Sequence, residues 1–404
     1  MECFAELATP VTTLARDFRF PSNLVVGNGT PRQKAAANLE AIRLLQLLER
    51  EQRPASDEEK RILVRYTGWG ALPQLFQPSP APEWQTAATD LKELLSEADY
   101  AAARASTPNA HYTSAPVITA IWETLTRLGA TSPLHILEPS LGIGHFFGLM
   151  PDSLAPNTVR VGIELDPLSA RIAQFLYPDS QIRLAGFETV ALPDGFFDLV
   201  VGNVPFGAYP VLDSRYKKHP ALTRSIHDYF LAKSVDLVRP GGLLALITSR
   251  HTLDKQNSAV REYVASKANL LAAVRLPNGT FRANAGTDVT TDLLFLQSRE
   301  SAVPEQAQPW LQLKTLQTCG RTHNLARRGT ITWPGFHFIS GALFPDDGTA
   351  GRITWPGVQN RSISRQRALK NSLPFLLYVG YYAHIRCVAR MKRLRTSDSG
   401  WSAQ

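Results

Sequence analysis

The chain contains few cysteines and lacks a long apolar run. Its three cysteines, Cys3, Cys319 and Cys387, lie far apart among 404 residues, and they match neither a disulfide framework nor the spacing of metal ligands. No run of 18 apolar residues occurs, so no membrane-spanning helix is predicted. The first residues include acidic side chains and no long apolar stretch, which is unlike a secretory signal. We therefore expect a cytoplasmic protein that makes no membrane contact.

Basic charge is not in excess over the first 300 residues. The net charge is +8, but residues 301–404 alone hold 14 Lys and Arg against 4 Asp and Glu, and the other residues hold 29 against 31. The high isoelectric point is therefore weak support for nucleic-acid binding by the main domain. The length and the 44% apolar content fit two or three globular domains.

The segment GNVPFG, residues 202–207, is the centre of the predicted site. It follows the apolar run 196–201, which has the composition of a buried parallel strand, and ligands of open α/β sheets bind at the carboxyl ends of strands. Asn203 offers an amide, Val204 offers a carbonyl held in an extended chain by Pro205, and Phe206 offers a flat ring. These groups suit a planar exocyclic amine such as that of a nucleobase. A turn followed by a packing phenylalanine is the alternative.

Two acidic strand ends precede that segment. An apolar strand from His135 leads into Glu138-Pro139-Ser140 and then Gly142-Ile-Gly144, where glycines allow close approach of the backbone to a ligand. The next predicted strand, in residues 159–167, ends in Glu164 and Asp166, the position that binds a ribose diol in nucleotide-binding sheets. A dinucleotide fingerprint needs a third glycine, and residues 142–147 read GIGHFF. The pattern predicts a ligand that carries a ribose but is not a dinucleotide.

Helices are predicted before this alternating region. The apolar spacing indicates a helix from Pro31, a second helix opened by a capping box at Ser56 and Glu59, and a third over residues 83–103. Trp69, between two glycines, is best explained as a buried packing residue. Tyr112 and Thr113 precede a helix capped by Ser114, and they can line a ligand pocket or simply pack.

Together, these motifs resemble those of the class I, S-adenosylmethionine-dependent DNA adenine-N6 methyltransferases. EPSLGIGHF (138–146) resembles the family's EPxxGxGxF loop, GIELD (162–166) its ribose-binding strand end, and NVPF (203–206) its catalytic [DNS]PP[YFW] motif. The order, with AHYT first and NVPF last, is that of the gamma arrangement. More narrowly, residues 30–300 resemble the methylase part of large mobile-element proteins that join an adenine methylase to a helicase.

The resemblance implies an α/β fold with a Rossmann-like, mostly parallel, seven-stranded sheet, helices on both faces and a last strand that is antiparallel. It implies methyl transfer from S-adenosylmethionine to the N6 amine of adenine in DNA, without a metal. The oxygens of Asn203 and Val204 would accept from the amine, and Phe206 would stack on the flipped base. The family has a second proline where Val204 stands, which puts the rigidity of the strand end in doubt. The implied cofactor-binding residues are Tyr112, Thr113, Glu138, Pro139, Ser140, Gly142, Gly144, Glu164, Asp166 and Glu188.

We therefore expect a loosely ordered N-terminus (1–29), a helical region (30–105), a methyltransferase domain (106–300) and a basic tail (301–404). In the tail, ITWPG occurs at 331–335 and again at 353–357, and in longer relatives a helicase domain or subunit would follow as a partner. Arg215, Lys217 and Lys218 form a small basic cluster that can hold DNA phosphates or remain a solvated loop.

Two other functions are open at this point. The same motifs serve methyltransferases that act on RNA bases or on protein amides. The chain could also be a catalytically silent module that binds DNA or a partner, since it lacks a recognisable target-recognition domain.

Overall fold

The computed structural model describes residues 17–21, 27, 29–108, 112–276, 290–300, 309–311, 313–318 and 321–326. The three cysteines, the ITWPG repeat and the remainder of the basic tail lie outside these residues. The helices are α1 (Pro31–Glu51), α2 (Asp57–Leu63), α3 (Pro82–Leu94), α4 (Glu97–Ser106), α5 (Ala115–Arg127), α6 (His145–Gly148), α7 (Pro167–Leu176), α8 (Ile226–Leu237), α9 (His251–Asp254) and α10 (Ala259–Lys267). Short 3-10 helices include 73–76, 152–154, 214–216, 220–223 and 309–311.

Seven strands form one sheet, as predicted. They are β1 (His135–Glu138), β2 (Val159–Glu164), β3 (Gln181–Leu184), β4 (Phe197–Asn203), β5 (Val238–Ser249), β6 (Ala268–Leu276) and β7 (Thr291–Ser298). Their order is β3-β2-β1-β4-β5-β7-β6, and β7 runs antiparallel to both of its neighbours. Strands β2 and β3 follow β1 toward one end of the sheet, whereas β4 and β5 follow it toward the other. The switch point is therefore between β1 and β4, and such sheets bind ligands there.

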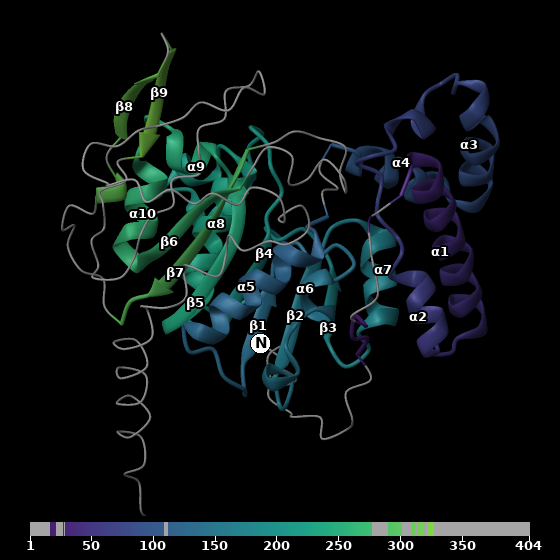
Figure 1. Cartoon of the computed structure of the whole chain (residues 1–404), viewed down its shortest axis with the longest axis horizontal. Coiled ribbons are helices and arrows are strands. Elements are labelled where there is room, and N and C mark those ends of the chain that lie inside the picture. Colours follow the sequence, from purple (N-terminus) through teal and green to yellow (C-terminus); the bar gives the residue numbers. More distant parts are fainter. Residues whose placement is uncertain are drawn as a thin grey trace, which may run out of the picture. The chain divides into compact units, whose positions relative to one another are not determined.

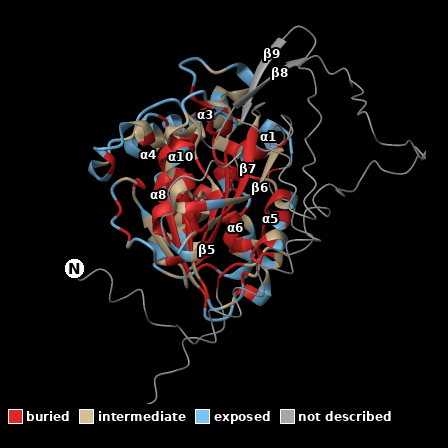
Figure 2. Ribbon diagram, turned by 90° about the vertical axis from the view of Figure 1, so that its left-hand side faces the viewer, coloured by how far each residue is buried: buried red, intermediate tan, exposed pale blue. Residues whose placement is uncertain are grey.

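Helices cover both faces of the sheet (Figure 1). On one face, Leu137, Val200 and Leu246 belong to a core cluster that also contains apolar residues of α8 and α10. Alternate residues of the same strands point to the other face, where α5 contacts β5. Residues 227–237 of α8 are all buried, because the helix packs on β5 and is itself covered by α10 and the 220–223 turn. Figure 2 shows this concentration of buried residues in the strands and in α8.

The helical region before the sheet is predicted correctly except for its third helix. The capping box at Ser56 is present, since Glu59 N donates to Ser56 Oγ (3.3 Å) and Ser56 N donates to the Glu59 carboxylate (2.8 Å). The expected helix 83–103 is instead α3 and α4, because Leu95 is extended and Ser96 caps a new helix by accepting from Asp99 N (3.1 Å). Local capping chemistry ends the helix despite its favourable composition.

The buried tryptophan of this region has the packing role expected of it. Trp69 is fully buried, with its ring edge-on to Tyr66 and to Phe76. Asn38 of α1 holds the turn before it, donating to Gly68 O (2.7 Å) and accepting from Thr67 N (2.8 Å). The region meets α7 through Arg171, which lies 3.2 Å from the Asp99 carboxylate.

The N-terminus differs from the expectation of loose order at residues 17–20. Phe18 N donates to Leu176 O (2.8 Å) and Phe20 N donates to Gly148 O (3.0 Å). Asp17 forms a buried ion pair with Arg160 of β2 (2.8 Å). The segment therefore packs on the domain that contains the sheet, through backbone hydrogen bonds and one buried charge pair. Neither kind of contact creates a periodic sequence pattern.

Strands β8 (Leu313–Thr318) and β9 (Arg321–Ala326) form a separate antiparallel hairpin. The sequence analysis does not anticipate it. No helix within the described ranges is long and apolar enough to cross a membrane.

Candidate active site

The glycine loop after β1 crosses the carboxyl edge of the sheet in a conformation that needs its glycines. Gly142 and Gly144 have φ values of +57° and +81°. A Cβ atom on Gly144 would lie 2.4 Å from Tyr177 Cε2, and the Tyr177 hydroxyl donates to Gly144 O (2.6 Å). The backbone of the loop is thus held in one position, with the Tyr177 ring lying where a side chain on residue 144 would be.

The acidic end of β2 is tied to this loop. The Glu164 carboxylate accepts from Gly142 N (2.6 Å) and from Asp166 N (2.7 Å). Burial, together with the charge of Asp166, raises the pKa of Glu164 to about 7. Asp166 caps α7 through Oδ2, which accepts from Ser169 N and Oγ (2.8 and 2.7 Å). Its buried Oδ1 has no hydrogen-bond partner among the described residues.

Glu138 lies at the end of the neighbouring strand and is 2% exposed. Burial raises its pKa well above the ordinary value, and the charge of Glu164 adds to the effect. Its Oε2 atom has no hydrogen-bond partner in the described part of the chain. Such an atom is costly to bury alone, so Glu138 suits a ligand that donates a hydrogen bond or carries positive charge. Pro139 is buried beside it.

Tyr112 and Thr113 reach the same loop from the entry to α5. Tyr112 Cε1 lies 3.1 Å from the position of a Cβ on Gly142, and its hydroxyl is 3.4 Å from Ser169 Oγ. Thr113 is buried, and the Ser114 side chain makes no capping hydrogen bond. Burial keeps His145 of the glycine loop neutral by lowering its pKa to about 4. His145 is not among the site residues predicted from the sequence, although it stands within the EPSLGIGHF motif.

The NVPF motif stands at the end of β4 as predicted. Asn203 is the last residue of the strand, and its carbonyl accepts from Ser140 Oγ (2.8 Å), which joins the motif to the glycine loop. Val204 is buried, with its N–H donating to Ile247 O of β5 (3.0 Å). Phe206 is partly buried and packs against the core cluster. Pro205 between them is half-buried.

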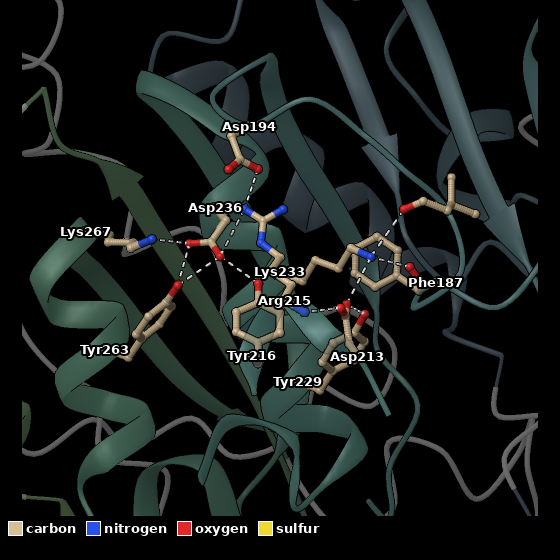
Figure 3. A network of polar contacts seen from close by, with 11 residues as sticks. Phe187, Asp194, Asp213, Arg215, Tyr216, Tyr229, Lys233, Asp236, Tyr263 and Lys267 are labelled. Carbon is tan, nitrogen blue, oxygen red and sulfur yellow. Dashed lines mark hydrogen bonds and ion pairs between the residues drawn. The ribbon is translucent and has the colours of Figure 1, made fainter. Parts of the chain in front are cut away.

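The remaining predicted residues are less closely connected. Glu188 lies after β3, with its carboxylate against Gly186, and no hydrogen bond joins it to the glycine loop in the described part of the chain. Lys217 and Lys218 are exposed. Arg215 is different, because its guanidinium contacts the Asp194 carboxylate and lies 3.5 Å from Asp236 (Figure 3). Of the predicted basic cluster, Lys217 and Lys218 present exposed ammonium groups, whereas the charge of Arg215 is engaged within the fold.

The arrangement fits a ligand that has a ribose, a positive charge and an apolar ring. Glu164 and Asp166 provide acceptors for hydroxyl groups, Glu138 suits the charged end, and the glycine loop leaves room. Leu165, between the two acidic residues, is 70% exposed and can cover an apolar ring. Leu165 is not among the site residues predicted from the sequence, although an apolar residue between two acidic ones is a recognisable pattern. No group of three or more His, Cys, Asp or Glu among the described residues is arranged to hold a metal.

The strand order, the antiparallel β7, the glycine loop after β1 and the acidic end of β2 define the class I methyltransferase fold. Residues 162–281 match the family model of the Eco57I restriction-modification methylase. This match confirms the resemblance to DNA-modifying methylases that the motifs indicate, while the adenine specificity stays a prediction.

Among characterised proteins, the chain is 28% identical over 341 residues to "Defense against restriction protein B" of Escherichia phage P1. The match covers 84% of this chain and 13% of that protein, so the chain spans only a small part of this relative's length.

Similar solved structures include a class I S-adenosylmethionine-dependent methyltransferase from Listeria monocytogenes (14% identity, 69% of this chain and 91% of that chain, TM-score 0.43). A second is a modification subunit of a type I restriction enzyme from Vibrio vulnificus (17% identity, 62% of this chain and 60% of that chain, TM-score 0.42). A third is a type I restriction-modification methyltransferase subunit from Streptococcus thermophilus (15% identity, 66% of this chain and 79% of that chain, TM-score 0.42).

Proposed function

We propose that this protein transfers a methyl group from S-adenosylmethionine to the exocyclic N6 amine of adenine in DNA. The observation that carries the proposal is the hydrogen bond between Ser140 Oγ and Asn203 O (2.8 Å). It places the end of β4, with its amide and adjacent carbonyl, directly beside the loop that suits the cofactor.

The cofactor would be held by the acidic strand ends and the glycine loop. Glu164 and Asp166 would accept from the ribose hydroxyls, and Glu138 would face the cationic end. Tyr112 and Thr113 would border the methionine part. The cofactor, when bound, supplies a methyl group already activated by a sulfonium, which is why the protein needs no nucleophile of its own.

The target amine would be held by two acceptors from this chain. Asn203 Oδ1 and the Val204 carbonyl would accept the two N–H groups of adenine N6, which orients the nitrogen lone pair toward the methyl carbon. As the new N–C bond forms and the bond from the methyl carbon to sulfur breaks, the positive charge would pass from the sulfur, which leaves as a neutral thioether, to the amine. Both acceptors would stabilise that charge until the amine releases one proton to water. Phe206 would stack on the base once it has left the duplex. The buried Val204, hydrogen-bonded to β5, gives its carbonyl a fixed position without the family's second proline.

Lys217 and Lys218 would contact target phosphates. We also propose that recognition of a DNA sequence depends on segments outside this chain, such as a helicase domain or subunit, because the chain spans 13% of its phage relative. The expected location is the cytoplasm, where DNA and S-adenosylmethionine are both present.

The test is transfer of a labelled methyl group to mixed-sequence DNA, RNA and protein by wild type, Asn203→Ala and Asn269→Ala. Asn269 is an exposed β6 residue that accepts from Arg299 (2.8 Å), so its variant is a matched control. We expect N6-methyladenine in DNA, a loss of about 10²-fold or more for Asn203→Ala, and little change for the control. Label in RNA or protein only, or equal rates for Asn203→Ala and wild type, would contradict the proposal.

A further inference from the structure

Four large apolar side chains among the described residues are exposed. They are Leu165 (70%), Leu184 (48%), Tyr209 (42%) and Leu212 (92%). The first two stand at the ends of β2 and β3, and the other two follow β4. Single exposed leucines are ordinary. Tyr209 and Leu212, however, lie within one short segment that directly follows the NVPF motif, and this position indicates contact with a ligand.

Tyr209 and Leu212 belong to a segment, residues 208–213, that is held on both sides of Leu212. Val211 N donates to Thr223 O (2.9 Å). The Asp213 carboxylate accepts from Tyr229 Oη (2.7 Å) and Arg215 N (2.9 Å). These contacts fix the residues on both sides of Leu212, and its side chain points outward between them.

A buried lysine secures the end of this segment. Lys233 of α8 is 4% exposed, and its ammonium lies 3.6 Å from Asp213 Oδ2 (Figure 3). The same ammonium donates to Phe187 O (2.6 Å) and Val190 O (3.3 Å) and lies 4.7 Å from the centre of the Phe187 ring. A buried cation is tolerated only with partners of this kind. The 208–213 segment is thus part of the rigid frame, as a preformed contact surface requires.

We propose that Tyr209 and Leu212 contact the DNA bases next to the target adenine. Apolar side chains that wedge between or stack on bases are a common means of holding bases exposed when a duplex is opened. The segment follows the NVPF motif directly, and Lys217 and Lys218 follow it, so apolar contact and phosphate contact lie on the same stretch of chain. The inference rests on the proposed function, because it takes DNA as the target.

The test measures binding of a labelled mixed-sequence duplex at several salt concentrations, with S-adenosylhomocysteine present. The variants are Leu212→Ser, Tyr209→Ala, Lys217→Ser and the matched control Leu184→Ser, an exposed leucine outside the segment. We expect Leu212→Ser and Tyr209→Ala each to weaken DNA binding about tenfold at every salt concentration, with an unchanged salt slope. Lys217→Ser should instead reduce the slope by about one, and Leu184→Ser should bind DNA as wild type does.

Calorimetry with S-adenosylhomocysteine separates this inference from the proposed function. All variants of the 208–213 segment should bind that compound as tightly as wild type. If Leu212→Ser binds DNA as wild type does, the segment serves another occupant, such as a protein, and the inference is overturned. If wild type transfers no methyl group to DNA yet Leu212→Ser still weakens DNA binding, the proposed reaction fails and the contact surface stands. A wild-type chain that binds no DNA defeats both.

Discussion

The ends of β1 and β2, where we propose that the cofactor binds, and the segment after β4, where we propose that the target binds, are held by different means. We call them the cofactor side and the target side. On the cofactor side, at β1 and β2, the contacts are made by the backbone, such as the bonds from Gly142 N and Asp166 N to Glu164. On the target side, after β4, the contacts are made by side chains of distant residues. Asp213 accepts from Tyr229 Oη (2.7 Å) and lies 3.6 Å from the ammonium of Lys233 (Figure 3).

This difference indicates a division of tasks. A loop built on backbone conformation presents nearly the same geometry whatever side chains surround it, which suits a ligand that never changes. A segment held by side chains can be altered by substitution without changing the strands below it. We infer that the cofactor side is the fixed half of the site and that the target side is the half open to variation.

The largest effect is expected from Gly144→Ala, which tests whether the cofactor side depends on backbone conformation. The new methyl group would meet Tyr177 Cε2 at 2.4 Å, at a φ of +81°. We expect a loss of about 3 kcal/mol in the free energy of unfolding and at least 100-fold weaker binding of S-adenosylhomocysteine. Gly195→Ala is the control, since Gly195 has a φ of +61° but its new methyl group would lie 3.9 Å from the nearest atom, Pro240 Cδ. It should cost about 1 kcal/mol and leave binding intact. Similar losses for both variants would contradict the role of the clash.

A similar loss of stability, but a smaller effect on ligand binding, is expected from Lys233→Met, which tests whether side chains hold the target side. The variant leaves the Asp213 carboxylate and two carbonyls without the ammonium, and we expect a loss of about 3 kcal/mol in unfolding free energy together with weaker DNA binding. Lys267→Met removes an ammonium that also pairs with an aspartate and lies 4.7 Å from a tyrosine ring, but its side chain is 39% exposed. It should cost about 1 kcal/mol. Denaturant unfolding measures the loss of stability in each variant, and titration with DNA measures its affinity. Equal DNA affinities for Lys233→Met and Lys267→Met would contradict the role of Lys233 on the target side.

The smallest effect concerns pH and Glu164. Its pKa of about 7 exceeds the ordinary 4.5, so the folded chain takes up a proton between these values. The contribution of Glu164 to unfolding free energy therefore falls as the pH rises from about 4.5 to 7. Ribose hydroxyls need the carboxylate as acceptor, so affinity for S-adenosylhomocysteine should fall nearly tenfold from pH 7.5 to pH 6. Glu164→Gln should bind more weakly with a flat pH profile. Calorimetry with S-adenosylhomocysteine between pH 6 and pH 7.5 measures these affinities. A wild-type affinity that does not change with pH would count against Glu164 as the acceptor for the ribose.

The cofactor side is also the part that the sequence predicts best. Glu138, Gly142, Gly144 and Glu164 lie within short motifs at strand ends, and parallel strands bring those ends to one edge whatever the rest of the chain does. Asn203 is predicted for the same reason. The roles assigned to these residues stay proposals, since they concern a bound cofactor and target.

The target side is predicted poorly because its contacts join distant parts of the chain. A lysine in a helix is ordinarily read as a solvated side chain, yet Lys233 is buried because α8 is covered on all sides. Arg215 looked available for phosphate, but Asp194 and Asp236 engage it. The packing of residues 17–20 was missed for the same reason, since the partner of Asp17 is Arg160 in β2.

The position of Lys233 has a thermodynamic consequence for the order of binding. Its single ammonium is shared between Phe187 O, on the cofactor side after β3, and Asp213, on the target side. A ligand that shifts one of these partners changes the strength of the other contact. Any change that the cofactor causes in the affinity for the target must then be matched by an equal change that the target causes in the affinity for the cofactor. One buried cation is thus a shared partner of the segment after β3 and the segment after β4, so a ligand that moves one of them acts on the contact to the other.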